Sequence, residues 1–302
     1  DRRGLRGGSR SRAAGAQPAP LGEGIAETDL AGLFDTGGTT GASKGVMLTH
    51  RNLIANALNW LASVPQLESD RTLVMAPMFH AAGSNGILAA IWQGSLQVPL
   101  GTFDPGAVLD LIEKHRINIT LGVPSMLAAI AEEQHANPRD TSSLQVLAHG
   151  GSPIATEVIR RASSAFPSAQ MIEVYGATET SPLATLLGHE ETLMDSVLAR
   201  SCGRAVVGCN ITVRDADGNE LPKGDVGEVV IAGTNIMKGY WKQPEQAAAV
   251  LKHGGDWTGH LGYRCPEGYV LLVDRATAMA GSGGQLGRAH GGRKGAWWRR
   301  WG

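Results

Sequence analysis

Residues 36–45 read Thr36-Gly37-Gly38-Thr39-Thr40-Gly41-Ala42-Ser43-Lys44-Gly45, and this stretch decides how the rest of the chain is interpreted. Glycines let successive backbone N–H groups converge on an anion, threonine hydroxyls add donors, and the lysine supplies a positive charge. The stretch is not a Walker A loop, because Ser43 precedes Lys44 where that motif has glycine. A flexible surface loop is the alternative interpretation. The composition favours a loop that holds the phosphates of a nucleotide.

Two later segments support the nucleotide interpretation. Tyr175-Gly176-Ala177-Thr178-Glu179-Thr180 follows the apolar run 171–174, so we expect it where a buried strand ends. A carboxylate flanked by hydroxyls at such a place suits a magnesium-bound nucleotide, since hard cations take oxygen ligands. Considered alone, Glu179 would be a solvated loop carboxylate. The second segment is Trp257-Thr258-Gly259-His260-Leu261-Gly262, and a strand end follows it at Val273-Asp274-Arg275.

Composition excludes several classes of protein. The chain has 302 residues, of which 42% are hydrophobic, so it is long enough for a large core and too apolar for general disorder. A formal net charge of -1 gives no field that would favour nucleic acid or a membrane surface. No apolar run approaches the roughly 18 residues of a transmembrane segment. The scattered cysteines, Cys202, Cys209 and Cys265, predict buried thiols and a cytoplasmic protein.

The pattern of apolar residues predicts an α/β fold with a mostly parallel sheet flanked by helices, followed by a β-rich subdomain. Between residues 30 and 187, short apolar runs alternate with helical periodicity. We expect strands at 73–76, 96–100, 117–121, 144–148 and 171–174, with helices at 84–93, 105–116, 125–135 and 154–166. Beyond about residue 200 the helical signal fades, and 211–214, 229–231 and 269–273 predict strands joined by loops.

These patterns divide the chain into four parts. Residues 21–200 form the α/β nucleotide-binding region and 201–275 the β-rich subdomain. Residues 1–20 are rich in Arg, Gly, Ser and Pro without periodicity, and 276–302 run through glycine-rich sequence into a Trp- and Arg-rich end. We expect both ends to be disordered or non-native sequence. A transit or RNA-contacting segment at the start and a membrane-surface patch at the end are the alternatives.

Taken together and in this order, the motifs resemble those of the adenylate-forming superfamily, which includes acyl-CoA synthetases, luciferases and the adenylation domains of peptide synthetases. Residues 36–45 resemble its phosphate loop, and 175–180 its Tyr-Gly-x-Thr-Glu motif. Three further segments fit: 77–83 (Pro-Met-Phe-His-Ala-Ala-Gly), 149–153 (His-Gly-Gly-Ser-Pro), and Gly227-Glu228 with Gly239-Tyr240-Trp241. Residues 77–149 look more like fatty-acid and related acyl-CoA ligases than peptide-synthetase domains.

The resemblance implies a reaction in which a carboxylic or fatty acid attacks the α-phosphorus of Mg-ATP, giving an acyl-adenylate, and the thiol of coenzyme A then displaces AMP. Catalysis would rest on alignment and charge neutralisation rather than on a protein nucleophile. Glu179 would bind magnesium, Thr178 the α-phosphate, and His80 would border the acyl pocket, although a lone histidine is often structural. The other residues implied in nucleotide binding are Thr36, Gly37, Gly38, Thr39, Thr40, Gly41 and Lys44 (phosphates), Gly150, Gly151, Ser152, Tyr175 and Gly176 (adenine slot), and His260 and Arg275 (ribose).

The chain departs from the family pattern in three ways. Asp35 stands where the family usually has an aromatic residue. His260 stands where the family has an aspartate that accepts hydrogen bonds from both ribose hydroxyls. The family's N-terminal part and its lysine-bearing C-terminal domain have no counterpart, so we expect a fragment. Tyr240 and Trp241 are expected in the core. The function predicted is that of an acyl-CoA ligase, and the alternative is a catalytically impaired nucleotide-binding remnant of one.

Overall fold

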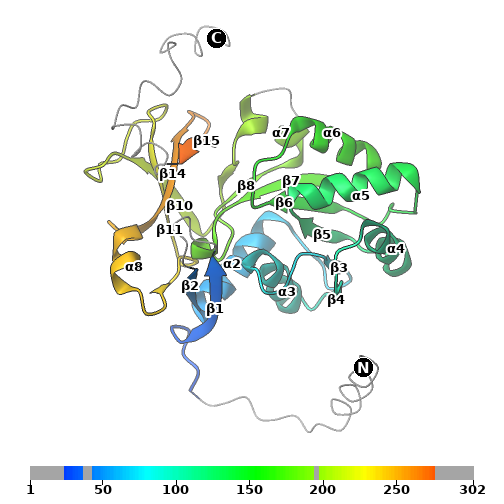
Figure 1. The fold of residues 1–302 in the computed structure, drawn as a ribbon, viewed down its shortest axis with the longest axis horizontal. Coiled ribbons are helices and arrows are strands. Elements are labelled where there is room, and N and C mark those ends of the chain that lie inside the picture. Colours follow the sequence, from blue (N-terminus) through cyan, green and yellow to red (C-terminus); the bar gives the residue numbers. More distant parts are fainter. Residues whose placement is uncertain (1–23, 37–42, 194–196, 276–302) are drawn as a thin grey trace.

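The structure is a computed structural model, and it describes residues 24–36, 43–193 and 197–275. Within these residues, the strands form three sheets, with seven, five and three strands (Figure 1). In the described part of the chain, no helix is both long enough and apolar enough to cross a bilayer. The predicted properties of residues 1–20 and 276–302 lie outside the described residues.

The seven-stranded sheet is parallel over most of its width. Its strand order is β4-β3-β5-β6-β7-β8-β9, with parallel pairing from β4 to β7 and antiparallel pairing beyond. The strands are β4 (Leu96–Pro99), β3 (Arg71–Val74), β5 (Ile119–Gly122), β6 (Val146–Gly150), β7 (Gln170–Tyr175), β8 (Thr185–Leu187) and β9 (Arg204–Ala205). This confirms the predicted fold class. Both faces of the central strands are buried, which is why these strands are nearly continuous apolar runs.

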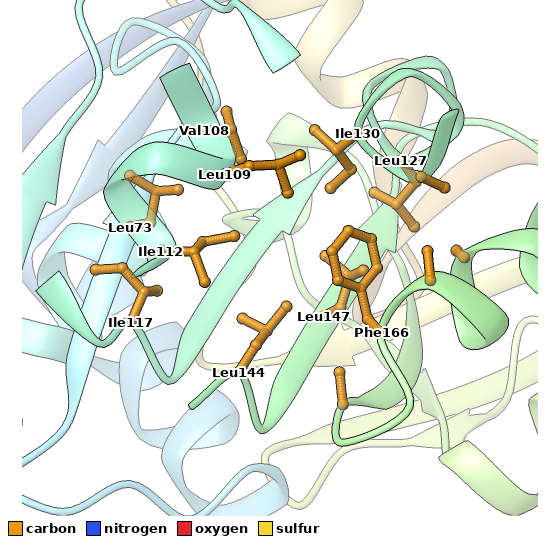
Figure 2. Close-up of a cluster of buried hydrophobic side chains, with 14 of the residues drawn as sticks. Leu73, Val108, Leu109, Ile112, Ile117, Leu127, Ile130, Leu144, Leu147 and Phe166 are labelled. Atoms are coloured by element: carbon orange, nitrogen blue, oxygen red, sulfur yellow. The ribbon is translucent and has the colours of Figure 1, made fainter. Parts of the chain in front are cut away.

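Helices cover both faces of this sheet (Figure 1). One face packs on α4 (Pro105–His115), α5 (Pro124–Ala136) and α6 (Thr156–Ala165), and the other on α2 (His50–Ser63) and α3 (Ala81–Gln93). Figure 2 shows the first of these cores, in which Ile112 of α4 and Leu127 of α5 pack above Leu147 of β6. Ala148, the next residue of β6, belongs to the opposite core beside Trp60 of α2. Side-chain alternation along one strand therefore supplies both cores.

Local signals set the ends of the predicted helices. Asp104 caps α4, because its side chain accepts a 2.8 Å hydrogen bond from the backbone N–H of Ala107, and Pro105 occupies the first turn. The helix ends where Arg116 adopts a left-handed conformation with φ of 52°. Helix α5 also begins with a proline, Pro124. The expected helices at 105–116 and 125–135 therefore agree with the structure to within one or two residues.

Helix α2 carries a row of buried asparagines, and sequence periodicity gave no prediction for it. Asn52 completes a capping box with Thr49, and its amide also donates to the carbonyls of Thr234 and Ile236 at 2.8 and 2.7 Å. Asn56 accepts from the N–H of Leu183, and Asn59 from that of Gly208. The spacing of 52, 56 and 59 puts all three on one helical face. That face binds backbone from distant parts of the chain.

The remaining strands form two antiparallel sheets. The five-stranded sheet contains β10 (Cys209–Arg214), β11 (Gly227–Gly233), β13 (Leu251–Lys252), β14 (Gly255–Arg264) and β15 (Val270–Arg275). The three-stranded sheet joins β1 (Leu30–Thr36) and β2 (Lys44–Thr49) to β12 (Gly239–Tyr240), which pairs with β2. The shorter helices are α7 (His189–Leu193) and α8 (Pro244–Val250), with 3-10 turns η1 (Thr178–Thr180) and η2 (Val197–Arg200). The division of the chain near residue 200 stays a prediction, although β12 crosses it by pairing with the N-terminal hairpin.

Candidate functional site

The stretch 36–45 spans a β hairpin. Thr36 ends β1 and Lys44 begins β2, and the two residues lie opposite each other in the antiparallel register. The hydroxyl of Ser43 donates a 3.2 Å hydrogen bond to the Thr36 carbonyl, so the loop closes at its base. The five residues between them that we assigned to phosphate binding lie outside the described residues: Gly37, Gly38, Thr39, Thr40 and Gly41. Their roles remain predictions that rest on the sequence.

Glu179 lies in the 3-10 turn η1, which follows β7 after Gly176 and Ala177. The hydroxyl of Thr180, fully buried, accepts from the N–H of Ala177 and donates to its carbonyl, both at 2.9 Å. The Glu179 carbonyl accepts from the N–H of Met237 at 2.8 Å. Gly176 permits the sharp exit from the strand, since a Cβ there would lie 1.7 Å from the Pro182 carbonyl oxygen. The turn is thus fixed on both sides of the carboxylate.

Tyr240 of β12 brings the hairpin lysine and the carboxylate of η1 to the same side chain. Its hydroxyl donates a 2.7 Å hydrogen bond to Oε1 of Glu179, and Lys44 Nζ lies 4.8 Å from the centre of its ring. A cation over an aromatic face is a favourable contact. Lys44 begins a strand of the three-stranded sheet, whereas Glu179 lies in a turn that follows the seven-stranded sheet, so the site depends on the pairing of β12 with β2. Burial and the nearby Glu179 carboxylate raise the pKa of Tyr240 above its ordinary value, and the hydroxyl stays a donor.

Tyr175 and His260 form the second contact between predicted site residues. The Tyr175 hydroxyl and His260 Nδ1 are 2.9 Å apart, and the two ring centres are 5.8 Å apart. Tyr175 ends β7, whereas His260 lies in β14, where it is paired with Arg275 of β15. Burial raises the pKa of Tyr175. The residues assigned to adenine and to ribose are therefore in direct contact across the boundary between the seven-stranded and five-stranded sheets.

Gly150 ends β6, beside β7, and Gly151 and Ser152 follow it. Gly150 pairs with Val174, and a Cβ on Gly150 would lie 2.3 Å from the Val174 carbonyl oxygen. Gly151 has a positive φ of 83°, and Ser152 is exposed. The two glycines let the chain turn closely over the strand end. In open parallel sheets, ligands bind beyond the carboxyl ends of the strands.

His80 lies at the N-terminus of α3, after β3. It is exposed, its ring is 4.7 Å from that of the exposed Phe79, and its side chain makes no capping hydrogen bond to the helix. The described structure does not link it to Glu179 or Tyr175. Among the described residues, the side chains of Thr178 and Ser152 make no hydrogen bond to Lys44, Tyr240 or Glu179. His80, Thr178 and Ser152 all follow strands at the carboxyl edge of the parallel sheet.

Buried acidic groups surround the site. Burial raises the pKa of Glu173 to about 7, two residues before Tyr175 on β7. Burial, with the charges of Glu179 and Glu228, raises the pKa of Asp256 to about 7. His149, at the end of β6, is fully buried, and burial lowers its pKa to about 4. These three groups are therefore poorly solvated, and burial shifts each of them toward its neutral form.

Sequence reasoning missed two features of the site. Tyr240 is buried as expected, but its hydroxyl also bonds to Glu179. It lies three residues after Met237, whose N–H binds the η1 turn. Nothing in the sequence around Tyr240 predicted its contact with Glu179. Asp256 directly precedes the Trp257–Gly262 segment and was not considered. The expectation that Trp241 lies in the core is wrong: it is 47% exposed, because side chains alternate between faces and Tyr240, the residue before it, takes the buried face.

The donor set around Glu179 fits magnesium only in company with phosphate. Within residues 24–36, 43–193 and 197–275, no group of three or more His, Cys, Asp or Glu side chains could hold a metal ion. Magnesium in nucleotide sites takes one or two carboxylates and draws its other ligands from phosphates and water. One carboxylate beside Lys44 meets that need. The residues present therefore fit a magnesium ion that arrives with a nucleotide.

Comparisons with known proteins agree with this geometry. The family model described as "AMP-binding enzyme" matches residues 6–241. A feruloyl-CoA synthase from Amycolatopsis is 35% identical over 277 residues, covering 90% of this chain and 54% of that protein. A medium/long-chain-fatty-acid–CoA ligase from Mycobacterium tuberculosis is 32% identical, with 91% and 48% covered. The crystal structure of the N-terminal domain of FACL13 from Mycobacterium tuberculosis matches with a TM-score of 0.80 at 29% identity, covering 88% of this chain and 65% of that one.

The chain spans about half the length of the curated relatives it matches. The family model covers most of the chain, including the hairpin, the η1 turn and β12. The motifs that carried the sequence interpretation lie within the matched range, apart from the Trp257–Gly262 segment and Arg275. The chain therefore belongs to the AMP-binding, adenylate-forming enzyme family.

Proposed function

We propose that the chain forms the nucleotide-binding part of an AMP-forming acid–CoA ligase. In that reaction the carboxylate oxygen of an acid attacks the α-phosphorus of ATP, pyrophosphate leaves, and the sulfur of coenzyme A then takes the acyl group and releases AMP. The observation that carries the proposal is the convergence of Lys44 and Glu179 on Tyr240. A cation and a carboxylate held together at the carboxyl edge of a sheet match the needs of a metal-bound triphosphate.

Each predicted residue has a proposed task. Lys44 and Thr36, with the loop 37–41, would bind the β- and γ-phosphates. Thr178 would donate to the α-phosphate from the turn that holds Glu179. Magnesium, when bound with ATP, neutralises phosphate charge, and Glu179 would hold it. Gly150, Gly151, Ser152, Tyr175 and Gly176 would line the adenine slot, with His260 and Arg275 at the ribose.

The acid would bind at the carboxyl edge of the parallel sheet, on the β3 side of the proposed nucleotide site. His80 follows β3, which lies two strands from β6, and it is exposed. We propose that it lies beside the carboxylate of the acid, where a ring N–H would donate a hydrogen bond as the acid and the triphosphate meet. The substrates proposed for the complete protein are a carboxylic or fatty acid, ATP and coenzyme A, and the proposed location is the cytoplasm.

A second candidate function is nucleotide binding without turnover. The observation that favours it is the hydrogen bond between His260 Nδ1 and the Tyr175 hydroxyl. A ring nitrogen engaged with tyrosine is a poorer acceptor for ribose hydroxyls than the two oxygens of a carboxylate. The two candidates differ in acid-dependent pyrophosphate release, which only the ligase shows.

Calorimetric titration with Mg-ATP tests nucleotide binding, which both candidate functions require. Lys44→Ala and Glu179→Gln should weaken binding at least about tenfold, the effect of losing one charge-assisted contact. The matched controls are Lys242→Ala and Glu245→Gln, which change exposed residues near β12 and should leave the affinity unchanged. Equal affinity in all five proteins would refute the assigned roles.

Pyrophosphate release then separates the candidates. The chain is incubated with Mg-ATP and a panel of carboxylic acids, with and without coenzyme A. Release that depends on one class of acid supports the ligase. Specific Mg-ATP binding without any acid-dependent release supports the binding-only candidate for this polypeptide.

A further inference from the structure

The turn that carries Glu179 is held by a buried side chain from another part of the chain, Asn235, which lies between β11 and β12. Its amide N–H groups donate to two carbonyls on either side of Ser181, that of Thr180 at 2.7 Å and that of Leu183 at 2.9 Å. The backbone carbonyl of Asn235 accepts from the Ser181 hydroxyl at 2.7 Å. Three hydrogen bonds therefore join this residue to the end of the η1 turn and the residues that follow it.

The amide of Asn235 is paired at both its nitrogen and its oxygen. The residue is fully buried, and its amide oxygen accepts from the Cys209 thiol at 3.3 Å. Ser181 is buried as well and has a left-handed backbone with a φ of 67°, which a residue other than glycine keeps only where its surroundings impose it. A buried polar group whose hydrogen bonds are all made makes the structure around it rigid. The contacts with Asn235 therefore fix the exit of the η1 turn.

The backbone on both sides of Asn235 is held by α2. The Asn52 amide donates to the carbonyls of Thr234 and Ile236 at 2.8 and 2.7 Å. Helix α2 directly follows β2, the strand that begins with Lys44. Asn52 therefore joins this segment to the lysine side of the candidate site, and Asn235 joins it to the carboxylate side.

The direction of the Glu179 carboxylate depends on this support. Among the described residues, the carboxylate accepts one hydrogen bond, from Tyr240, so the backbone of the turn must supply the rest of its orientation. Resting on the ligase function proposed above, we infer that Asn235 is a positioning residue that holds Glu179 where it binds the magnesium ion of Mg-ATP. Groups that orient a metal ligand without touching the metal typically change metal affinity about 10- to 100-fold when they are removed.

Calorimetric titration of the 302-residue chain with ATP, once in magnesium and once in EDTA, tests this role. Asn235→Ala should weaken the binding of Mg-ATP about tenfold, because the turn loses both amide bonds. The affinity for ATP in EDTA should change less than about threefold, because no metal ligand is then needed. A buried asparagine with a purely structural role would weaken the binding of both forms of ATP alike.

A double-mutant cycle shows whether Asn235 acts through Glu179. In Glu179→Gln the proposed metal ligand is already lost, so adding Asn235→Ala should weaken Mg-ATP binding less than about threefold further. In the original chain the same substitution should cost about tenfold. The difference between the two effects is the coupling of Asn235 to the Glu179 carboxylate.

Asn118→Ala is the matched control. Asn118 accepts from the N–H of Arg71 at 2.9 Å and donates to the Ser143 carbonyl at 3.3 Å. It precedes β5, so it lies at the amino edge of the parallel sheet, opposite the candidate site. The control removes a comparable pair of bonds to backbone and should leave the magnesium dependence of ATP binding unchanged.

Ser181→Ala is a second and milder variant. It removes one hydrogen bond to Asn235 and leaves the amide in place. We expect it to weaken Mg-ATP binding about threefold, with no effect in the Glu179→Gln background. This variant provides the test if Asn235→Ala does not fold.

The outcomes separate this inference from the proposed function. If Glu179→Gln weakens Mg-ATP binding but Asn235→Ala and Ser181→Ala do not, the positioning role is disproved while the proposed function stands. Equal weakening in magnesium and in EDTA, or the same loss in the Glu179→Gln background, also overturns it. If the folded original chain binds ATP in neither buffer, the proposed function fails and this inference fails with it.

Discussion

The hydroxyl of Tyr240 donates a 2.7 Å hydrogen bond to Oε1 of Glu179, although 61 positions separate the two residues in the chain. Tyr240 is 4% exposed and pairs through its backbone with Val46 of β2. One side chain therefore fixes the distance between the hairpin that begins with Lys44 and the turn that carries the carboxylate. The Tyr240 hydroxyl orients Glu179, and the Tyr240 ring lies under Lys44.

Replacing Tyr240 with Phe separates those two contributions. Tyr240→Phe keeps the ring but removes a hydrogen bond to a carboxylate, which should lower the free energy of unfolding by about 1–3 kcal/mol and weaken Mg-ATP binding. Tyr269→Phe is the matched control, since Tyr269 donates a similar 2.8 Å bond to Glu191 away from the site. Urea denaturation should show a loss in both variants, and calorimetry should show weaker nucleotide binding in Tyr240→Phe alone. Equal Mg-ATP affinity in the two variants would contradict the orienting role.

Replacing His260 with Asp should tighten ATP binding. A carboxylate at this position offers two acceptors to the ribose hydroxyls, where an imidazole offers one and already contacts Tyr175. Charge-assisted hydrogen bonds of about 1.5–3 kcal/mol correspond to roughly 10- to 150-fold in affinity. The gain should disappear with 2′,3′-dideoxy-ATP. An unchanged dissociation constant for ATP in a folded His260→Asp variant would place the ribose elsewhere.

Stability should fall with rising pH because of Glu173. Burial raises the pKa of this carboxyl to about 7 in the folded chain, above its ordinary value of 4.5. The folded state therefore favours the protonated form, and its contribution is complete below pH 4.5 and lost as the pH rises through 7. The loss is at most about 3 kcal/mol, by the linkage between pKa and stability. Glu173→Gln, compared with the original chain by denaturation from pH 5 to 8, should be the more stable protein at pH 8.

His149 changes the pH dependence of stability in the opposite direction to Glu173. Comparing the original chain with Glu173→Gln therefore isolates the contribution of Glu173. Burial lowers the pKa of His149 to about 4, so its contribution is present above pH 6.5 and is lost as the pH falls toward 4. Both proteins in the comparison contain His149. If the stabilities of the two proteins keep a constant difference across the pH range, Glu173 is ionised in the folded state throughout.

Gly176→Ala should disrupt the turn that carries Glu179. The added Cβ would lie 1.7 Å from the Pro182 carbonyl oxygen and 2.7 Å from the Thr180 hydroxyl, and neither can move without breaking the η1 turn. We expect a loss of about 3 kcal/mol or more, typical of overpacking against backbone. Gly101→Ala, where nothing lies within 4 Å of the added atom, should change the midpoint of thermal unfolding little. Similar midpoints for the two variants would show that the turn relaxes.

The parallel sheet could be predicted because its strands and helices carry local signals. The strands 119–122 and 146–150 are buried on both faces, so they are apolar runs, and α4 is marked by Asp104 and Pro105 at its start. Helix α2 could not be predicted in this way. Its inward face carries Asn52, Asn56 and Asn59, whose amides bond to backbone rather than pack in a core, so the apolar periodicity is interrupted.

The candidate site could be predicted as a set of residues but not as an arrangement. Short motifs mark Lys44, Tyr175 and Glu179, since glycines and hydroxyl residues surround them in sequence. Lys44 and Glu179 are joined through Tyr240, which contacts both. Tyr240 lies on β12, a strand of two residues that is too short to show an alternating apolar pattern. The pairing of β12 with β2 is a long-range contact, and a sequence pattern contains no signal for it.

The asparagine face of α2 also constrains the order in which parts of the chain can fold during synthesis. Asn56 binds a residue 127 positions later, Asn59 one 149 positions later, and Asn52 one 184 positions later. During synthesis from the N-terminus, the distant partners of Asn56, Asn59 and Asn52 therefore emerge in turn, at residues 183, 208 and 236. The last of these long-range bonds of α2 can form only after the first half of the β-rich region has left the ribosome.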